Sequence, residues 1–249
     1  MRIGDIHKLQ EKKYRKEFGL YIIQGEKSVD EACAAGIVQE LFCIESLYGK
    51  YKKIIPQTHV VSQSALQQAG TQATADGVIA LAECSYAPLT ESELTALRRA
   101  AESESMLVLD GISDPGNFGT IIRTADWFGI THIVCSIGTV DVYNPKVIAA
   151  TMGSFLRVQI HYTVLSPFLS SLKQQGSTIV GAVLDGEPLS VSALPYPAVL
   201  VMGSESHGLD VDTNTHITKR ITIPRKGGAE SLNVAVATAI LLSHMDSGR

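Results

Sequence analysis

The chain has 249 residues, 45% of them hydrophobic and 18% charged, which excludes an intrinsically disordered protein and allows one or two domains with apolar cores. No apolar run approaches the ~18–20 residues of a membrane span, and the first residues lack the apolar stretch of a secretory signal, so we expect a cytoplasmic protein without a membrane partner. The net charge of −4 is unlike that of proteins that bind nucleic acids nonspecifically, although a local basic patch is compatible with it.

The first 86 residues alternate short helix-like and strand-like stretches, which predicts a compact α/β unit. Helices are expected over 4–17, 26–36 and 62–70, and strands over 21–25, 37–46, 59–62 and 77–84. Residues 1–16 carry six basic side chains and two acidic ones. The densest part of this basic cluster, which is either a solvated helix face or a contact for RNA phosphates, comprises Lys12, Lys13, Arg15 and Lys16.

A change of pattern over 85–93 marks a domain boundary near residue 88. Thr90 followed by Glu93 is a capping box, which predicts the start of a helix over 91–102. We therefore expect a first domain over 1–88, a linker helix within 89–105 and a second domain over 106–249.

The second domain resumes the alternation with longer elements. Strands are expected over 106–112, 131–138, 156–162, 177–184, 198–203 and 220–224, and helices over 117–129, 144–153, 166–176 and 230–245. Strands that alternate with helices predict a parallel sheet covered on both faces. The fold class is therefore α/β.

Three strand ends in this domain carry polar loops that contain glycine, over 110–119, 203–209 and 224–233. Ligands of parallel α/β sheets bind beyond the carboxyl ends of the strands, so we expect these loops to converge on one site. No GxGxxG or GxxxxGK[ST] motif is present, which argues against a dinucleotide site or a P-loop. The four cysteines lack zinc-ligand spacing, and no metal site is expected.

The helix over 117–129 offers two polar features. Asn117 is expected to cap it after a turn at 114–116. Arg123 and Trp127 share its polar side, where they are either solvated or part of an interface or stacking site.

The other two loops leave alternatives open as well. Ser231 is either a simple N-cap of the last helix or part of a site with Glu230 and Asn233 at its first turn. His207 is either an exposed loop side chain or, because histidine titrates near neutrality, a catalytic group.

Taken together, the three loops resemble the motifs of the SpoU/TrmH family of RNA ribose methyltransferases, part of the SPOUT class. The resemblance covers roughly 106–249, and residues 1–86 resemble, more loosely, the substrate-binding domain of the branch that modifies ribosomal RNA. The first motif has the family's Asn-x-Gly-x-x-x-Arg-x-Ala pattern, the second its Gly-x-Glu-x-x-Gly-Leu pattern, and the third its Ile-Pro, loop and Ser-Leu-Asn pattern. They are Asn117, Gly119, Arg123 and Ala125; Gly203, Glu205, Gly208 and Leu209; and Ile223 and Pro224 with 230–237.

The resemblance implies a trefoil knot, a homodimer with active sites at its interface, and S-adenosyl-L-methionine (AdoMet) as the cofactor. It implies transfer of a methyl group to a ribose 2′-oxygen in RNA, and the first domain favours ribosomal over transfer RNA. Arg123 is then the central catalytic residue, either as a base or as a cation that stabilises charge. Catalytic positioning falls to Asn117, Glu205, Ser231 and Asn233, and AdoMet binding to Met202, Gly203, Ile223 and Leu232.

Three other functions fit the same motifs. The chain could methylate transfer RNA, act on a base or a protein, or serve as a catalytically silent RNA-binding assembly factor. The intact Arg123, Glu205 and Asn233 argue against the silent version.

Overall fold

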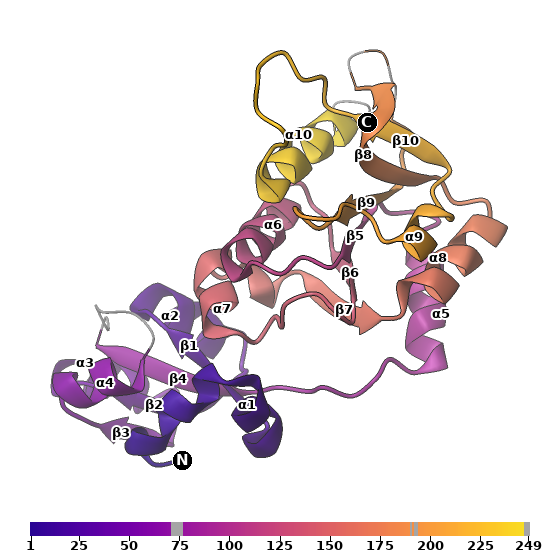
Figure 1. The fold of residues 1–249 in the computed structure, drawn as a ribbon. Coiled ribbons are helices and arrows are strands. Elements are labelled where there is room, and N and C mark those ends of the chain that lie inside the picture. The colour runs from indigo at the N-terminus through magenta and orange to yellow at the C-terminus, as the bar shows by residue number, and fades with distance from the viewer. Residues whose placement is uncertain (71–76, 190, 192–193, 247–249) are drawn as a thin grey trace. The chain divides into compact units, whose positions relative to one another are not determined.

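The structure is a computed structural model, which describes residues 1–70, 77–189, 191 and 194–246. The chain divides into two compact units (Figure 1). The first combines Met1–Ala87 with Asp141–Leu156, and the second combines Pro88–Val140 with Arg157–Arg249. Residues 141–156 thus group with the first unit, whereas the sequence pattern assigns them to the second domain.

The first unit is built on a four-stranded mixed sheet with the order β1-β4-β2-β3. β4 is antiparallel to β1 and β2, whereas β3 is parallel to β2. The strands are β1 (Leu20–Gln24), β2 (Val38–Cys43), β3 (Thr58–Val60) and β4 (Val78–Glu83). The helices are α1 (Lys12–Phe18), α2 (Glu26–Ala34), α3 (Glu45–Tyr51), α4 (Gln63–Ala69) and α7 (Pro145–Thr151), with 3-10 helices η1 (Ile3–Gln10) and η2 (Ser154–Leu156).

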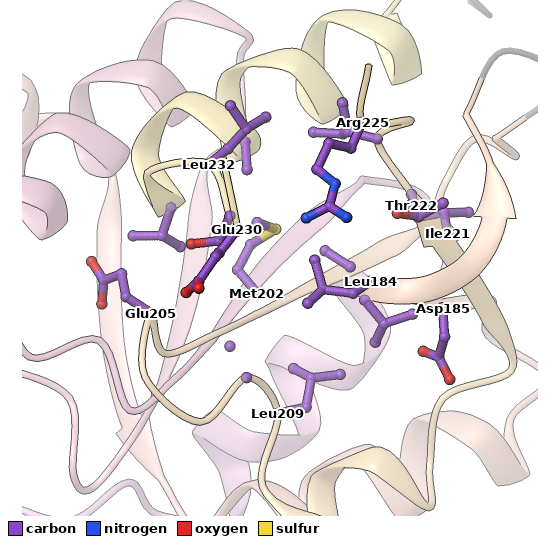
Figure 2. Close-up of a pocket in the computed structure, with 18 of the residues that line it drawn as sticks. Leu184, Asp185, Met202, Glu205, Leu209, Ile221, Thr222, Arg225, Glu230 and Leu232 are labelled. Atoms are coloured by element: carbon purple, nitrogen blue, oxygen red, sulfur yellow. The ribbon is translucent and has the colours of Figure 1, made fainter. Parts of the chain in front are cut away.

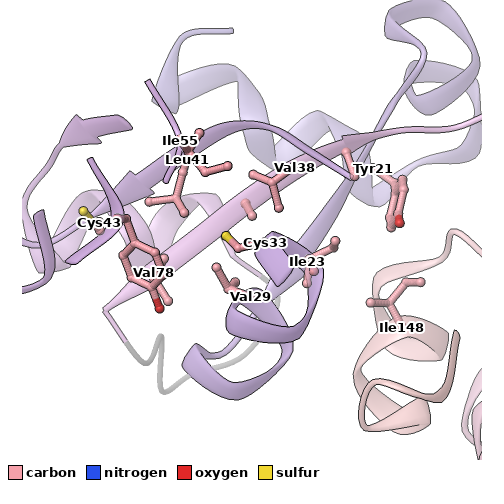
Figure 3. Close-up of a cluster of buried hydrophobic side chains, with 14 residues drawn as sticks. Tyr21, Ile23, Val29, Cys33, Val38, Leu41, Cys43, Ile55, Val78 and Ile148 are labelled. Carbon is pink, nitrogen blue, oxygen red and sulfur yellow. The ribbon is translucent and has the colours of Figure 1, made fainter. Parts of the chain in front are cut away.

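Both faces of this sheet are buried, because apolar side chains occupy both sets of alternating positions along the strands. In β4, Val78 and Ala80 belong to one apolar cluster, while Ile79 and Leu81 belong to another. Ile148 of α7 joins the first of these clusters (Figure 3). This packing is the physical reason why 141–156 group with the first unit.

The prediction of a single helix over 4–17 is wrong. η1 ends at Gln10, and Glu11 is extended, with φ −94° and ψ 134°, before α1 begins. The break turns the carbonyl groups of Leu9 and Gln10 toward the Arg15 guanidinium, which donates hydrogen bonds of 2.8 and 2.9 Å to them. A continuous helix would have used those carbonyl groups for its own hydrogen bonds.

The second unit contains a six-stranded sheet with the order β10-β8-β9-β5-β6-β7, and every pairing is parallel. The predicted α/β class and parallel sheet are therefore confirmed. The strands are β5 (Met106–Asp110), β6 (His132–Ser136), β7 (Gln159–Thr163), β8 (Ile179–Pro188), β9 (Val199–Gly203) and β10 (Lys219–Thr222). The helices are α5 (Glu91–Ala100), α6 (Pro115–Trp127), α8 (Leu165–Gln174), α9 (Val211–Asn214) and α10 (Val234–Asp246).

Helices cover both faces of the six-stranded sheet (Figure 1). Leu97 of α5 and Phe168 of α8 pack in one apolar cluster with Val108 of β5. Leu107 and Leu109, the alternate side chains of β5, are also fully buried, and α10 contacts both α6 and β9. The predicted capping box is confirmed at the start of α5. Within the described residues, no helix is long and apolar enough to cross a membrane.

Candidate functional site

The first turn of α6, which follows β5, and the loops that follow β9 and β10 are joined by a chain of side-chain hydrogen bonds. The Asn117 side-chain amide donates to Glu205 Oε1. Asn233 Nδ2 in turn donates to Asn117 Oδ1 at 2.8 Å. Residues from three separated segments therefore meet at the carboxyl end of the sheet, as the loop pattern predicts.

The α6 end of this chain differs from the expectation. Asp114, not Asn117, caps α6, because its Oδ1 accepts the backbone N–H of Asn117 at 2.7 Å. The helix begins at Pro115. Asn117 thus lies in the first turn, and its side chain is free to bond with Glu205 and Asn233.

The α10 end differs in a similar way. The helix begins at Val234, four residues after the expected start, so Glu230 and Ser231 lie in the preceding loop. Asn233 Oδ1 accepts the backbone N–H groups of Ala235 and Val236, at 2.9 and 3.3 Å. The N-cap is therefore Asn233 and not Ser231. This capping also fixes the direction in which the Asn233 amide group points.

The loop that carries Glu205 is a tight turn. Ser204 and Gly208 exchange two backbone hydrogen bonds of 3.0 Å. A Cβ atom at Gly203 would lie 2.2 Å from the Gly208 carbonyl carbon, so only glycine allows this approach. Asp110 Oδ2 accepts the Asp210 N–H at 2.9 Å and ties the end of the turn to β5. Glu205 is exposed near the start of this fixed turn.

A cavity of about 940 Å³ opens beside these loops (Figure 2). Glu205 and Ser231 line it, as do all four residues expected to bind a cofactor, which are Met202, Gly203, Ile223 and Leu232. Asn117 and Asn233 are not part of the lining, but they connect to it through the hydrogen bond from Asn117 to Glu205.

The sequence pattern missed the part of the cavity formed by β8 and β10. The register in which β10 pairs with β8 changes between Arg220 and Ile221. Leu184 and Asp185 line the cavity at this point. Arg220 also lines it and donates hydrogen bonds of 2.6 Å each to Asp185 and Asn214. The hydrogen bond from Arg220 lowers the pKa of the Asp185 carboxyl group. No sequence motif marks these residues, because their positions depend on the bend of β8.

A family model described as the SpoU rRNA Methylase family matches residues 104–243. The chain belongs to this family. A second model, described as the MRM3-like substrate binding domain, matches residues 1–80. The SpoU match contains all three loops of the hydrogen-bonded chain.

Full-length relatives agree with this assignment. The chain is 30% identical to the 23S rRNA (guanosine(2553)-2′-O)-methyltransferase RlmP of Bacillus subtilis, over 98% of this chain and 95% of that protein. A putative RNA methyltransferase of the TrmH family from Porphyromonas gingivalis superposes with a TM-score of 0.82 at 34% identity, covering 98% and 96% of the two chains. An AdoMet-bound rRNA methyltransferase from Sinorhizobium meliloti superposes with a TM-score of 0.84 at 27% identity, covering 98% and 94%.

Arg123, the residue that the SpoU resemblance makes central, does not line the cavity of its own chain. It lies six residues after Asn117 on α6, roughly 9 Å along the helix axis and on a different side of the helix. Its side chain is exposed, and within the described residues no hydrogen bond or ion pair engages it. Trp127, one turn further on, is 85% exposed.

The expected basic cluster divides into two parts. Lys12, Lys13 and Lys16 are exposed, and the ammonium groups of Lys12 and Lys16 lie 5.8 and 5.4 Å from the centre of the Tyr86 ring. Arg15 is only 2% exposed. The structure therefore removes Arg15 from the surface on which RNA could bind.

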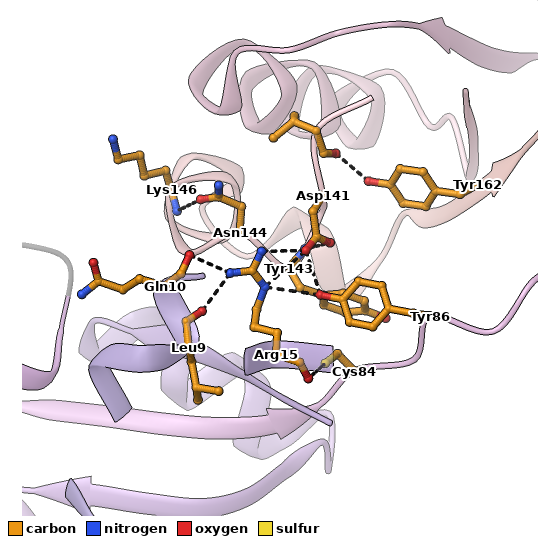
Figure 4. A network of polar contacts seen from close by, with 11 residues as sticks. Leu9, Gln10, Arg15, Cys84, Tyr86, Asp141, Tyr143, Asn144, Lys146 and Tyr162 are labelled. Atoms are coloured by element: carbon orange, nitrogen blue, oxygen red, sulfur yellow. Dashed lines mark hydrogen bonds and ion pairs between the residues drawn. The ribbon is translucent and has the colours of Figure 1, made fainter. Parts of the chain in front are cut away.

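The Arg15 guanidinium is occupied within the first unit (Figure 4). Its Nη2 donates to Asp141 Oδ2 at 2.7 Å, and its Nε contacts the Tyr86 hydroxyl at 3.3 Å. The Tyr86 hydroxyl also donates to Asp141, at 2.8 Å. Burial raises the pKa of Tyr86, and the hydrogen bond to Asp141 raises it further. Arg15 is thus a structural residue.

His207 lines the cavity but is exposed, and its Nδ1 lies 2.7 Å from the hydroxyl oxygen of the neighbouring Ser206. This contact is local to the turn. It supports the reading of His207 as a loop residue more than a catalytic one.

Proposed function

We propose that this chain transfers a methyl group from AdoMet to a ribose 2′-oxygen of ribosomal RNA. Membership of the SpoU rRNA methylase family supports this function, as does full-length similarity to a 23S rRNA 2′-O-methyltransferase. The observation that carries the proposal is the hydrogen-bonded chain of Glu205, Asn117 and Asn233, because it joins three separated loops beside one cavity.

The cavity fits AdoMet in size and chemistry. Its volume falls in the roughly 300–1,000 Å³ range of small-molecule sites, and its lining combines apolar side chains with a few charged ones. Met202, Gly203, Ile223 and Leu232 would hold the cofactor. Bound AdoMet would supply a methyl group on a sulfonium, from which S-adenosylhomocysteine leaves as a neutral thioether.

The chain's own residues must then orient the ribose and stabilise the oxygen as its proton leaves. Glu205 and Ser231 line the cavity and can contact the ribose, while Asn117 and Asn233 hold Glu205 in place. Arg123 acts as a cation that stabilises the developing alkoxide, since a guanidinium hardly ever loses its proton in proteins.

A homodimer would bring Arg123 to a cavity that it does not reach in its own chain. α10 is apolar around most of its circumference and packs on α6, and such a helix is normally covered on all sides. Yet Val236 and Ile240 on α10 are 49% and 37% exposed, and Trp127 on α6 is 85% exposed. We propose that a second copy covers this surface and that Arg123 of the partner subunit completes the site.

RNA binding is assigned to the first unit, which matches a substrate-binding domain. Lys12, Lys13 and Lys16 are the exposed part of the basic cluster and would contact phosphates. A trefoil knot in the second unit and a cytoplasmic location remain predictions from the family resemblance.

The proposal is tested by incubating the purified chain with labelled AdoMet and either ribosomal or transfer RNA that lacks modifications. We expect incorporation into ribosomal RNA that depends on Glu205, so that Glu205→Gln abolishes it. Preferential incorporation into transfer RNA would move the enzyme to the alternative substrate. AdoMet binding without incorporation into either RNA would instead indicate a catalytically silent assembly factor.

A further inference from the structure

Within the part of the chain that the structure describes, four charged side chains of the cavity lining have no oppositely charged partner, which are Glu205, Arg225, Lys226 and Glu230. Among the described residues, no carboxylate pairs with Arg225 and no cation pairs with Glu230. Figure 2 shows the Arg225 guanidinium and the Glu230 carboxylate directed into the cavity. Both residues come from the 223–233 loop that precedes α10.

The second arginine of the cavity shows how different this situation is. Arg220 donates to Asp185 and Asn214, at 2.6 Å each, so its charge is balanced within the protein. Arg225, in contrast, makes one hydrogen bond with the described residues, from Nη1 to the Ala229 carbonyl oxygen at 3.2 Å. That bond holds the guanidinium in place across its own loop and leaves most of its N–H donors available.

We infer that Arg225 and Glu230 bind the α-carboxylate and the α-ammonium group of the methionyl end of AdoMet. This inference rests on the proposed function, since it assumes that AdoMet occupies the cavity. A cation and an anion in one cavity complement a zwitterionic amino acid, whereas the RNA backbone would offer only negative charges. The planar guanidinium suits a carboxylate, with which it forms two parallel hydrogen bonds.

The remaining lining fits the other end of the cofactor. Its apolar side chains would face the adenine ring, which needs contact area more than charge. They include Leu184, Met202, Leu209, Ile221, Ile223 and Leu232. Arg225 and Glu230 would therefore bind the amino-acid group of AdoMet, which simpler adenine nucleosides lack.

The test is calorimetric titration of the purified full-length chain, without RNA, using AdoMet and 5′-methylthioadenosine. Methylthioadenosine keeps the adenosine and the sulfur but lacks the amino-acid group. For Arg225→Gln we expect the dissociation constant of AdoMet to rise about 10-fold or more, the usual effect of losing one charge-assisted contact. The dissociation constant of methylthioadenosine should not change. Arg225→Lys, which keeps the charge but not the planar fork, is expected to lose less.

Two matched variants separate Arg225 from its neighbours. Lys219→Gln is the first control, because it also removes one positive charge, but from a position on β10 outside the cavity lining. This variant should bind AdoMet like the wild type. Lys226 borders the same cavity, so a loss with Lys226→Gln and none with Arg225→Gln would overturn the assignment. If Arg225→Gln weakens the binding of AdoMet and of methylthioadenosine equally, the assignment is overturned too, because that result would indicate a damaged cavity.

S-adenosylhomocysteine, which keeps the amino-acid group but has no sulfonium charge, tests Glu230. Glu230→Gln should weaken AdoMet and S-adenosylhomocysteine alike. Weakening of AdoMet alone would place Glu230 at the sulfonium and contradict the inference. If the wild type does not bind AdoMet at all, the proposed function itself is contradicted. If the wild type binds AdoMet and the Arg225 and Glu230 variants bind it equally well, only this inference is contradicted.

Discussion

Two arginines, one in each unit, differ in whether the fold provides partners for their charge. Arg15 in the first unit is 2% exposed and donates to Asp141 and to two backbone carbonyl groups. Arg123 in the second unit is exposed, and no described residue pairs with it. Removing a charge that the fold has paired leaves its buried partner uncompensated and destabilises the fold, whereas a charge that the fold leaves open is available for a ligand or partner.

The largest effect is expected on stability, when Arg15 is replaced. Arg15→Met leaves the buried Asp141 carboxylate without its ion-pair partner, and breaking a buried pair in this way typically costs about 3–5 kcal/mol of unfolding free energy. Urea unfolding at equilibrium measures the loss. Lys13→Met, at an exposed position on the same helix, should change stability by less than about 0.5 kcal/mol. A stable Arg15→Met protein would mean that this network contributes little.

The functional side predicts the opposite pattern for Arg123. Arg123→Ala should lower methyl transfer by roughly 10²–10³-fold, the usual effect of removing one group that stabilises transition-state charge, and should leave the urea midpoint nearly unchanged. Arg99→Ala, another exposed helical arginine of the second unit, is the control and should retain activity. Full activity in Arg123→Ala would remove this residue from the site.

Asn233 caps α10 and also belongs to the proposed site, so its substitution sharpens the comparison. Asn233→Ala removes the N-cap of α10, at a cost of about 1 kcal/mol, and also removes the hydrogen bond to Asn117. Asn144→Ala removes the cap of α7 alone and should cost a similar amount. Only the Asn233 variant should lose methyl transfer by 10-fold or more. Comparable activity in the two variants would show that capping is the whole role of Asn233.

The smallest effect concerns the exposed lysines next to Tyr86. Lys12→Gln with Lys16→Gln should reduce the slope of log K against log salt concentration for RNA binding by about 0.7–0.9 per lysine. Lys27→Gln with Lys53→Gln, two exposed lysines elsewhere in the first unit, is the matched control and should leave the slope unchanged. An unaltered slope in the Lys12 and Lys16 variant would mean that this surface is only solvated.

The sequence pattern predicted the elements of regular structure well, because strand and helix periods are local. It predicted the class, the parallel sheet, the α5 capping box and the convergence of three loops. It could not predict that Arg15 is buried, since its partner Asp141 lies 126 residues away along the chain. It also placed the start of the last helix four residues early, because Ser231 and Asn233 are both good caps and only the bonds from Ala235 and Val236 decide between them.

The cavity was the least predictable part of the site. Leu184 and Asp185 reach it because β8 continues past the register shift opposite Ile221. A Cβ atom at Gly186 would lie 2.5 Å from the Ile221 carbonyl carbon, so the close approach of these strands requires glycine there. Nothing in the local pattern of β8 distinguishes this glycine from one in an ordinary turn.

The most direct test of the central claim is the position of the transferred methyl group. Ribosomal RNA methylated by the purified chain with labelled AdoMet is digested to nucleosides, and the labelled nucleoside is identified by mass spectrometry. We predict a 2′-O-methylated ribonucleoside, in which fragmentation leaves the label on the ribose. A label that stays on the base would contradict the account of these loops as a ribose methylation site.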